Sequence, residues 1–309
     1  MAEPLVIAVI LNTNHREDTL ACLGSLQRQD YGNLRVIVLD NASTDGSVEA
    51  IQCQYPAVQI IGLTQNLGYA GNNNTGIQAA VAQGADWVYV MNEDIVLAED
   101  SIRQLVCQSQ MDPRVGMAGP LVYHFTQPTV VQSAGGWMSR TWQSFHYGQN
   151  EPDQGQFTQP RPVDWISGCA ILVRREVIEQ AGMLDERFFY YWEETEWCVR
   201  AARHGWKLLF VPQSKIWHKG VQVDYAPSPN VTYYWTRNWF LLLAKHRAPL
   251  TAWLYACLTI GRNLLVWTLK PKWRSKRGHR DAMWQGTLDF LQSRWGMRPV
   301  RPVRSASER

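Results

Sequence analysis

Several patterns that define other classes of protein are missing from these 309 residues. None of the six cysteines forms a C-x-x-C pair, so neither a zinc site nor a disulfide framework is indicated, and we expect reduced thiols in a cytoplasmic protein. No basic region precedes the first apolar run, which argues against a signal peptide. With 46% apolar and 18% charged residues and no low-complexity tract, the composition is that of a globular chain.

The two common phosphate-binding motifs are also absent. The first predicted strand is not followed by G-x-G-x-x-G, and no lysine-bearing P-loop occurs, which argues against redox dinucleotide binding and ATP hydrolysis. A different loop, NLGYAGNNNTG (66–76), stands before a helix of small residues. Its glycines would let backbone N–H groups approach a phosphate or a ribose, although asparagine-glycine loops are also common turns.

Acidic residues are scarce at the C-terminus. From Lys270 to Arg309 there are eleven Lys or Arg against three Asp or Glu, a net charge of +8, which leaves −5 for the rest of a chain whose total is +3. Such a tail points to an anionic surface, which could be a membrane, a nucleic acid or an acidic partner; a solvated tail is the plain alternative. Its aromatic residues follow a helical apolar pattern and not a stacking platform, so we expect no nucleic-acid binding.

No uninterrupted apolar run is long enough to span a membrane. The best candidate, LTAWLYACLTIGRNLLVWTLK (250–270), is broken near its middle by Arg262 and Asn263. Two interpretations stay open: a helix packed on the preceding domain, or a helix lying in the membrane interface ahead of the Lys/Arg run. The second would give peripheral membrane association through residues 250–309.

Four apolar runs alternate with helical patterns in the first hundred residues, at 5–12, 34–40, 58–63 and 86–91. Because parallel neighbours need crossover connections, this alternation predicts a doubly wound, mainly parallel α/β sheet. Ligands bind beyond the carboxyl ends of the strands in such sheets. The candidate binding residues are therefore the polar ones at those ends, namely Asn12, Asp40, the loop around Gly68, and Asp94.

Two carboxylates, Glu93 and Asp94, stand where the fourth strand emerges. A few protein oxygens completed by substrate phosphates are the usual way to hold Mg²⁺ or Mn²⁺. The alternative is that Asp94 caps a helix that begins near Glu99. The strand end therefore predicts a metal-diphosphate site, with a helix cap as its competitor.

A second acidic cluster lies among aromatic residues and contains Glu193, Glu194 and Glu196. Burial raises the pKa of a carboxyl group, which suits a general base near neutral pH. Acids favoured by a helix N-terminus would explain one or two of the three equally well. His218, in IWHKG, is either a metal or phosphate ligand or a structural histidine.

Taken in order, these motifs resemble the family 2 glycosyltransferases of the GT-A fold, especially the rhamnosyltransferase-like branch that builds bacterial surface polysaccharides. The segments that carry the resemblance are VILNTN (9–14), DNASTDGS (40–47), NLGYAGNNNTG (66–76), MNEDIVL (91–97), residues 167–207 and WHKG (217–220). The resemblance implies a GT-A domain over 1–247, with its nucleotide-binding part in about 1–98 and its acceptor and catalytic part in about 99–247. A helical, aromatic and basic extension would follow over 248–309.

The resemblance also implies an inverting, metal-dependent transferase that moves a sugar from a nucleotide-diphosphate sugar to a hydroxyl of a glycan or lipid-linked acceptor. The donor would be dTDP-rhamnose or a UDP-sugar. Asn12 and Asp40 would line the base pocket, while Asn66 and Gly68 would shape the loop against the nucleoside. The protein would work in the cytoplasm, at the inner face of the cell membrane if the basic extension attaches to lipid.

For the reacting groups, the resemblance places Asp94 on a Mg²⁺ or Mn²⁺ ion at the donor diphosphate, next to Glu93. His218 would contact the metal or the diphosphate. Glu194 would be the catalytic base, with Glu193 and Glu196 as alternatives, because the family often has aspartates where this chain has glutamates.

Two other functions compete with this prediction. A sugar nucleotidyltransferase would carry a glycine-rich basic loop directly after the first strand, where this chain has NTNHRED. A non-catalytic assembly protein with a degenerate site is suggested by the glutamates that stand in place of aspartates.

Overall fold

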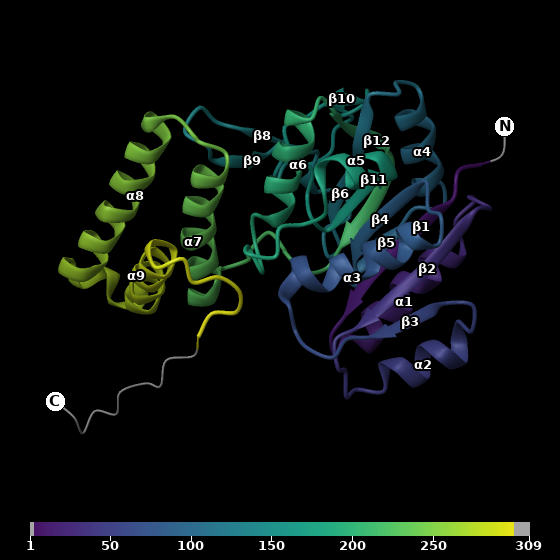
Figure 1. The fold of residues 1–309 in the computed structure, drawn as a ribbon, viewed down its shortest axis with the longest axis horizontal. Helices are drawn as coiled ribbons and strands as arrows, with labels where there is room; N and C mark the ends of the chain where they lie inside the picture. Colours follow the sequence, from purple (N-terminus) through teal and green to yellow (C-terminus); the bar gives the residue numbers. More distant parts are fainter. Residues whose placement is uncertain (1–2, 300–309) are drawn as a thin grey trace.

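Four parallel strands begin the large sheet of this computed structural model, which describes residues 3–299 (Figure 1). Their bounds are β1 (Val6–Asn12), β2 (Leu34–Asp40), β3 (Gln59–Gly62) and β4 (Trp87–Asn92). They lie in the order β4-β1-β2-β3, and every neighbouring pair is parallel. The crossover helices are α1 (Arg16–Gln27), α2 (Ser47–Gln54) and α3 (Gly68–Ala82). The predicted doubly wound, mainly parallel sheet is confirmed.

Alternation along β1 separates two cores, one on each face of the sheet. Ala8 packs with Leu23 of α1 and with the helix α4 (Ser101–Gln110) on one face. Val9 packs with Ile77 of α3 and with Trp197 of α6 (Glu193–Arg203) on the other. The sheet is thus covered on both faces, and only the ends of its strands are left for ligands.

The second half of the sheet extends from β4 through β11 (Ala170–Arg174) and β6 (Val115–His124) to β12 (Lys207–His218). β11 is antiparallel to both of its neighbours, whereas β6 and β12 are parallel. The remaining elements are β5 (Ile95–Leu97), β7 (Val131–Ser133), β10 (Arg161–Pro162), the hairpin β8 (Gly136–Met138) and β9 (Ser144–His146), and α5 (Arg175–Ala181).

One short strand, β5, corrects an expectation about Asp94. The chain turns at Glu93 and Asp94 directly from β4 into β5, and α4 begins only at Ser101. The helix-cap interpretation of Asp94 is therefore wrong, since no helix starts there. β5 pairs instead with the end of β12, with Ile95 opposite His218.

Aromatic and basic helices form the C-terminal part, which stands beside the sheet in Figure 1. They are α7 (Pro229–Lys245), α8 (Leu250–Leu269), the short 3-10 helix η1 (Pro271–Lys276) and α9 (Arg277–Leu291). Although α7 precedes the predicted domain boundary at residue 247, it packs against α8 and α9, and the boundary stays a prediction. No helix within residues 3–299 is long and apolar enough to cross a membrane. Residues 300–309 of the predicted basic tail lie outside the described residues.

Candidate active site

Asp94 and His218 meet at the carboxyl ends of β4 and β12. The register of β5 on β12 brings them together across more than a hundred residues, with Asp94 Oδ1 at 3.2 Å from His218 Nε2. The two atoms are at ion-pair distance but not in hydrogen-bond geometry, and the buried Asp94 Oδ1 has no hydrogen-bond donor among the described residues. A buried carboxylate oxygen without a donor is costly unless a cation supplies the missing interaction.

The surroundings of His218 fit a metal ion. Its Nδ1 lies 2.8 Å from the side-chain oxygen of Gln132, which can only accept a hydrogen, so the ring proton is assigned to Nδ1. The unprotonated Nε2 then accepts a hydrogen bond from Asn92 Nδ2 at 3.4 Å, a long contact that a metal ion could replace. Space for an ion is kept by Gly220, because a Cβ there would lie 2.7 Å from Asp94 Oδ2 and 3.0 Å from His218 Nε2. No group of three or more acidic, histidine or cysteine ligands exists within residues 3–299. A Mg²⁺ or Mn²⁺ ion here would need further oxygens from a phosphate ligand.

Glu93, the other acid of the turn, has a partner of its own. Its Oε1 lies 2.5 Å from His15 Nδ1, so this carboxylate ties the end of β4 to the loop between β1 and α1. Burial raises the pKa of Glu93, the charge of Asp94 raises it further, and His15 acts against both. The structure therefore places Glu93 beside the predicted metal site without directing it at His218.

The three glutamates of α6 differ sharply in their surroundings. Glu196 is fully buried and ion-paired, with Arg200 Nη2 and Lys245 Nζ each at 2.9 Å and His246 Nε2 at 3.1 Å. Burial alone would raise the pKa of Glu196, but His246, Arg200 and Lys245 lower it to about 2. A carboxylate held ionised by three partners is a weak base, so Glu196 has the properties of a structural ion-pair centre.

Glu193 and Glu194 lack such partners. Burial, together with the neighbouring Glu194, raises the pKa of Glu193 well above its ordinary value, and Glu193 Oε2 has no hydrogen-bond donor among the described residues. Burial also raises the pKa of Glu194, which is only half-buried as a residue and bonds Thr195 Oγ1 at 3.2 Å. Of the three candidates, Glu194 combines access with a raised pKa, the properties of a general base.

One short segment, residues 167–169, joins the two acidic clusters. The carbonyl of Cys169 accepts a hydrogen bond from the backbone N–H of Asn92 at 2.9 Å, one step before the Glu93–Asp94 turn. Gly168 packs against Glu194, since a Cβ there would lie 3.1 Å from Glu194 Cγ. The Asp94 site and Glu194 therefore flank the same few backbone atoms.

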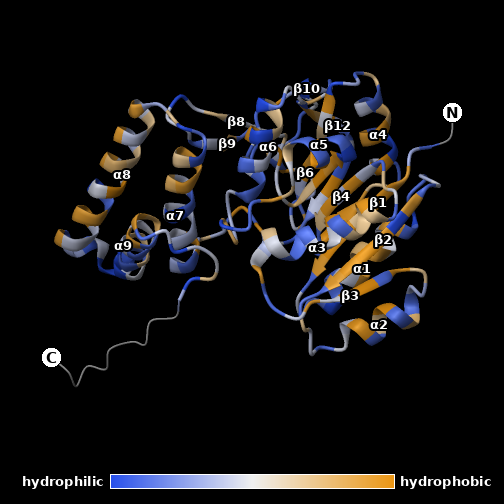
Figure 2. Cartoon of the chain, in the orientation of Figure 1, coloured by the Kyte–Doolittle hydropathy of each residue, from blue (hydrophilic) through white to orange (hydrophobic). Residues whose placement is uncertain are grey.

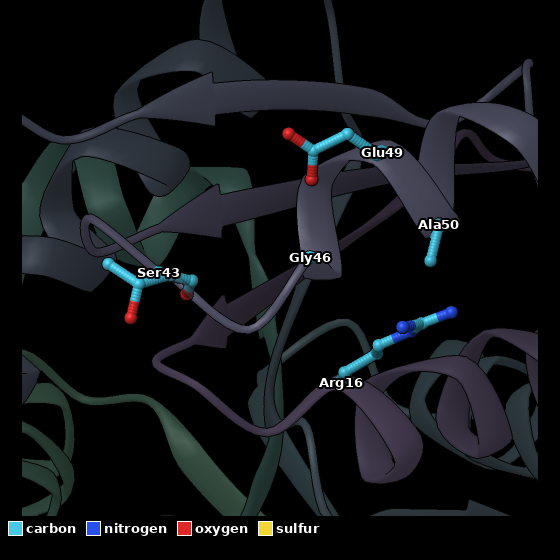
Figure 3. Close-up of a pocket in the computed structure, with 6 residues that line it drawn as sticks. Arg16, Ser43, Gly46, Glu49 and Ala50 are labelled. Atoms are coloured by element: carbon cyan, nitrogen blue, oxygen red, sulfur yellow. The ribbon is translucent and has the colours of Figure 1, made fainter.

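Asn12 and Asp40, the predicted base-pocket residues, are bonded to each other. Asn12 Nδ2 donates to Asp40 Oδ1 at 2.9 Å and to Ser43 Oγ at 3.0 Å, and Thr19 Oγ1 donates to Asn12 Oδ1 at 2.8 Å. This buried network fixes the loops after β1 and β2. Ser43 also lines an open hollow of about 540 Å³, into which Arg16 projects from the start of α1 (Figure 3). No residue of the two acidic clusters lines this hollow.

Asn66 and Gly68 shape the start of α3. Asn66 Oδ1 accepts a hydrogen bond from the backbone N–H of Gly68 at 2.9 Å. Gly68 has φ +75 and lies so close to Phe189 that a side chain would collide with its carbonyl and ring, which requires glycine. The predicted nucleoside loop thus contacts the segment that leads into α6.

That segment, residues 187–192, is strained and held by α7. Three of its residues are in the left-handed region without being glycine, Phe189, Tyr191 and Trp192. The fully buried Asn238 donates from Nδ2 at 2.8 to 2.9 Å to three backbone carbonyl oxygens, those of Phe188, Tyr190 and Tyr191. Arg237, also fully buried, adds bonds to the carbonyls of Arg187 and Phe188. Sequence reasoning missed Asn238, Arg237 and Gln132, because nothing local marks a polar residue of one element as the partner of another.

Comparison with known proteins agrees with this architecture. Residues 6–182 match the family described as glycosyl transferase family 2, more than half of the chain. The chain belongs to this family and is a glycosyltransferase, with a fold of the GT-A type.

Two relatives by sequence and one solved structure are similar to this chain over most of its length. An N-acetylglucosaminyl-diphospho-decaprenol L-rhamnosyltransferase of Mycobacterium tuberculosis is 30% identical over 273 residues, covering 79% of this chain and 87% of that protein. The dTDP-rhamnosyl transferase RfbF of Shigella flexneri is 28% identical, covering 93% and 95%. Among solved structures, a mannosyltransferase of Pyrobaculum calidifontis in complex with GDP-Man and Mn²⁺ superposes with a TM-score of 0.59 at 16% identity, over 94% of this chain and 88% of that one. The last likeness concerns the fold alone.

Proposed function

We propose that this glycosyltransferase is inverting and metal-dependent, and that it moves a sugar from a dTDP- or UDP-sugar to a hydroxyl of a lipid-linked or glycan acceptor. The rhamnosyltransferases named above support dTDP-rhamnose as the donor and a lipid-linked acceptor. The observation that carries the proposal is that residues 167–169 contact both the strand end before Asp94 and the side chain of Glu194. Asp94 Oδ1, next to His218, is buried without a hydrogen-bond donor among the described residues, and Glu194 lies on the other side of residues 167–169 with a raised pKa.

The chain's own residues would divide the reaction between them. Asp94 and His218 would hold Mg²⁺ or Mn²⁺, which, when bound, neutralises charge on the donor diphosphate. Glu194 would take the proton from the acceptor hydroxyl while that oxygen attacks the anomeric carbon. A single displacement of this kind inverts the anomeric configuration and needs no covalent intermediate. Asn12, Asp40, Asn66 and Gly68 would position the nucleoside through the loops that they fix.

The proposal includes the cellular location of the reaction. A nucleotide-sugar donor and a lipid-linked acceptor would meet at the cytoplasmic, inner face of the cell membrane, in the synthesis of a surface polysaccharide. Peripheral attachment through the C-terminal helices would bring the site to such an acceptor.

Donor binding tests the metal site. In a thermal-shift panel of UDP-, dTDP- and GDP-sugars, each with and without Mn²⁺, one nucleotide series should raise the melting temperature only with the metal. At a hundredfold excess over Kd the stabilisation is about 2.7 kcal/mol, or a shift of roughly 5 °C. Asp94→Ala should abolish the shift, whereas Asp224→Ala, which removes an exposed acid four residues after Gly220 in the sequence, should retain it. A metal-independent shift, or one retained in Asp94→Ala, would contradict the metal site.

Turnover tests the base. Glu194→Gln should lose transfer and keep the metal-dependent donor shift, while Glu176→Gln, an exposed acid in the first turn of α5, should keep both. Normal transfer by Glu194→Gln would move the base to Glu193. No shift and no Mn²⁺-dependent donor hydrolysis in the wild-type chain would favour the non-catalytic assembly protein.

A further inference from the structure

The outer face of α8 carries a stripe of leucines that nothing in the described chain covers. Leu250, Leu254, Leu258, Leu265 and Leu269 are 73%, 54%, 72%, 60% and 67% exposed. Their spacing places them on one side of the helix, over roughly 28 Å. Figure 2 shows α8 as a largely hydrophobic helix at the edge of the molecule, away from the sheet.

The inner face of the same helix is apolar as well, with Trp253, Leu264 and Trp267 packed against the protein. Ala252, Ala256 and Ile260 are buried in the aromatic cluster with α7 and α9. A surface helix of a globular protein normally turns its large apolar residues inward and exposes polar ones. On α8 the outer face is apolar in addition to the inner one, which indicates an apolar environment outside the protein.

A group of cations follows this stripe directly. Lys270, Lys272, Arg274, Lys276 and Arg277 have no carboxylate within ion-pair distance among residues 3–299. The sequence has no Asp or Glu at all between Asp224 and Asp281. The surface formed by the leucine stripe and these five cations therefore combines exposed apolar area with uncompensated positive charge.

We propose that this surface, the α8 face with the basic segment 270–277, binds an anionic lipid membrane. Leucines would enter the boundary between headgroups and acyl chains while the cations contact the headgroup phosphates. Arg262, at the edge of the stripe, can extend its guanidinium to the same level along its apolar stem. The helix lies in the interface and does not cross it.

Charge complementarity favours a lipid membrane over other partners for this surface. A second copy of the chain would offer no carboxylate from its own 225–280 region to the five cations. A nucleic acid would match the cations but leave five leucines in contact with water or phosphate. Of these three occupants, the lipid surface is the one that satisfies the leucines and the cations together.

Vesicle sedimentation tests the proposal on the full chain. Wild-type protein should sediment with phosphatidylcholine vesicles that contain 30% phosphatidylglycerol, and at least tenfold less with pure phosphatidylcholine. Leu258→Gln/Leu265→Gln should weaken binding to the anionic vesicles tenfold or more, and Lys272→Gln/Arg274→Gln roughly twentyfold at low salt. The matched control is Met111→Gln/Leu291→Gln, which removes two comparably exposed apolar side chains outside the α8 stripe and should bind as wild type.

Three results would overturn the proposal: unchanged binding by the leucine variant, equal binding to neutral vesicles, or no binding by wild type. Light scattering tests the competing partner, a second copy of the chain. If wild type is a dimer that does not bind vesicles, and Leu258→Gln/Leu265→Gln is a monomer, the stripe is a dimer interface. The surface deepens the peripheral attachment proposed above by naming its residues and its lipid, and its test uses no nucleotide sugar. Vesicle binding without any donor shift would therefore refute the reaction and leave the surface standing.

Discussion

Replacing Asn238 by alanine should loosen the segment that leads into α6 more than any other part of the molecule. The change removes the amide that bonds the carbonyls of Phe188, Tyr190 and Tyr191. The amide has two hydrogens to share among these three acceptors, so at about 1 kcal/mol for each the unfolding free energy should fall by about 2 kcal/mol. Holding a non-glycine residue in the left-handed region costs about 1 kcal/mol or more, so the segment has reason to relax once these bonds are lost.

The consequence for function follows from the position of the segment. It ends at Trp192, directly before Glu193 and Glu194, and its Phe189 contacts the loop at Gly68. We therefore expect Asn238→Ala to lower kcat and to raise the KM of the donor, with the loss exceeding the small unfolded fraction. Asn238 acts here by positioning, since its amide bonds only to backbone carbonyls and Arg237.

Hydrogen exchange measured by mass spectrometry reads the segment directly. A drop of about 2 kcal/mol in local stability should speed exchange in peptides covering 187–196 by roughly thirtyfold, with little change in β1 or β4. Thr236→Val is the control, because Thr236 is buried on the same helix but bonds only the carbonyl of Thr232, at 2.8 Å. Uniformly faster exchange, or unchanged exchange in 187–196, would refute the reasoning.

Three further changes have expected outcomes. The pKa of Glu193 is raised in the folded state, so the folded protein loses stability as pH rises above the pKa that Glu193 has in the unfolded chain. Glu193→Gln, which stays neutral, should therefore melt at a higher temperature than wild type at pH 8 and at the same temperature at pH 4. A lower melting temperature of the variant at pH 8 would contradict this. Gly220→Ala should place a Cβ against Asp94 Oδ2 and His218 Nε2 and abolish the Mn²⁺-dependent donor shift, and a retained shift would locate the metal elsewhere. The pKa of Glu196 is lowered to about 2, so its ionised form stabilises the fold by about 3 kcal/mol above pH 4.5, and this stabilisation disappears as pH falls to 2. In urea unfolding, Glu196→Gln should have a lower free energy of unfolding than wild type at pH 6, and the difference should shrink by pH 3. A difference that does not change with pH would contradict the ionisation of Glu196.

Much of the fold could be predicted from the sequence because its determinants are local. Apolar runs such as VIAVIL read as buried strands wherever they stand, and parallel neighbours require helices between them. The rule that ligands bind at the carboxyl ends of such strands then placed Asn12, Asp40 and Asp94 at one edge. Short β5 was missed, since three residues carry too little periodicity to distinguish a strand from the start of a helix.

The chemistry of individual side chains was decided only by tertiary contacts. In the sequence, Glu194 and Glu196 are equivalent acids two residues apart, but α6 turns one toward Gly168 and the other into a cage of Arg200, Lys245 and His246. A helix advances 100° per residue, so neighbours in sequence enter opposite environments. The pKa of each then depends on elements that the local sequence does not contain.

The sequence by itself determined the alternation of strands and helices, the carboxylates at their ends and the basic, acid-free C-terminal region, because composition and period are properties of a segment. It left open which face of α8 is covered, and only the packing of α7 and α9 on Ala252, Ala256 and Ile260 showed that the leucines point outward. The partners of His218 and the hydrogen bonds from Asn238 to residues 188–191 were likewise decided by the tertiary structure. Contacts between distant elements depend on how the whole chain packs, and no local pattern encodes them.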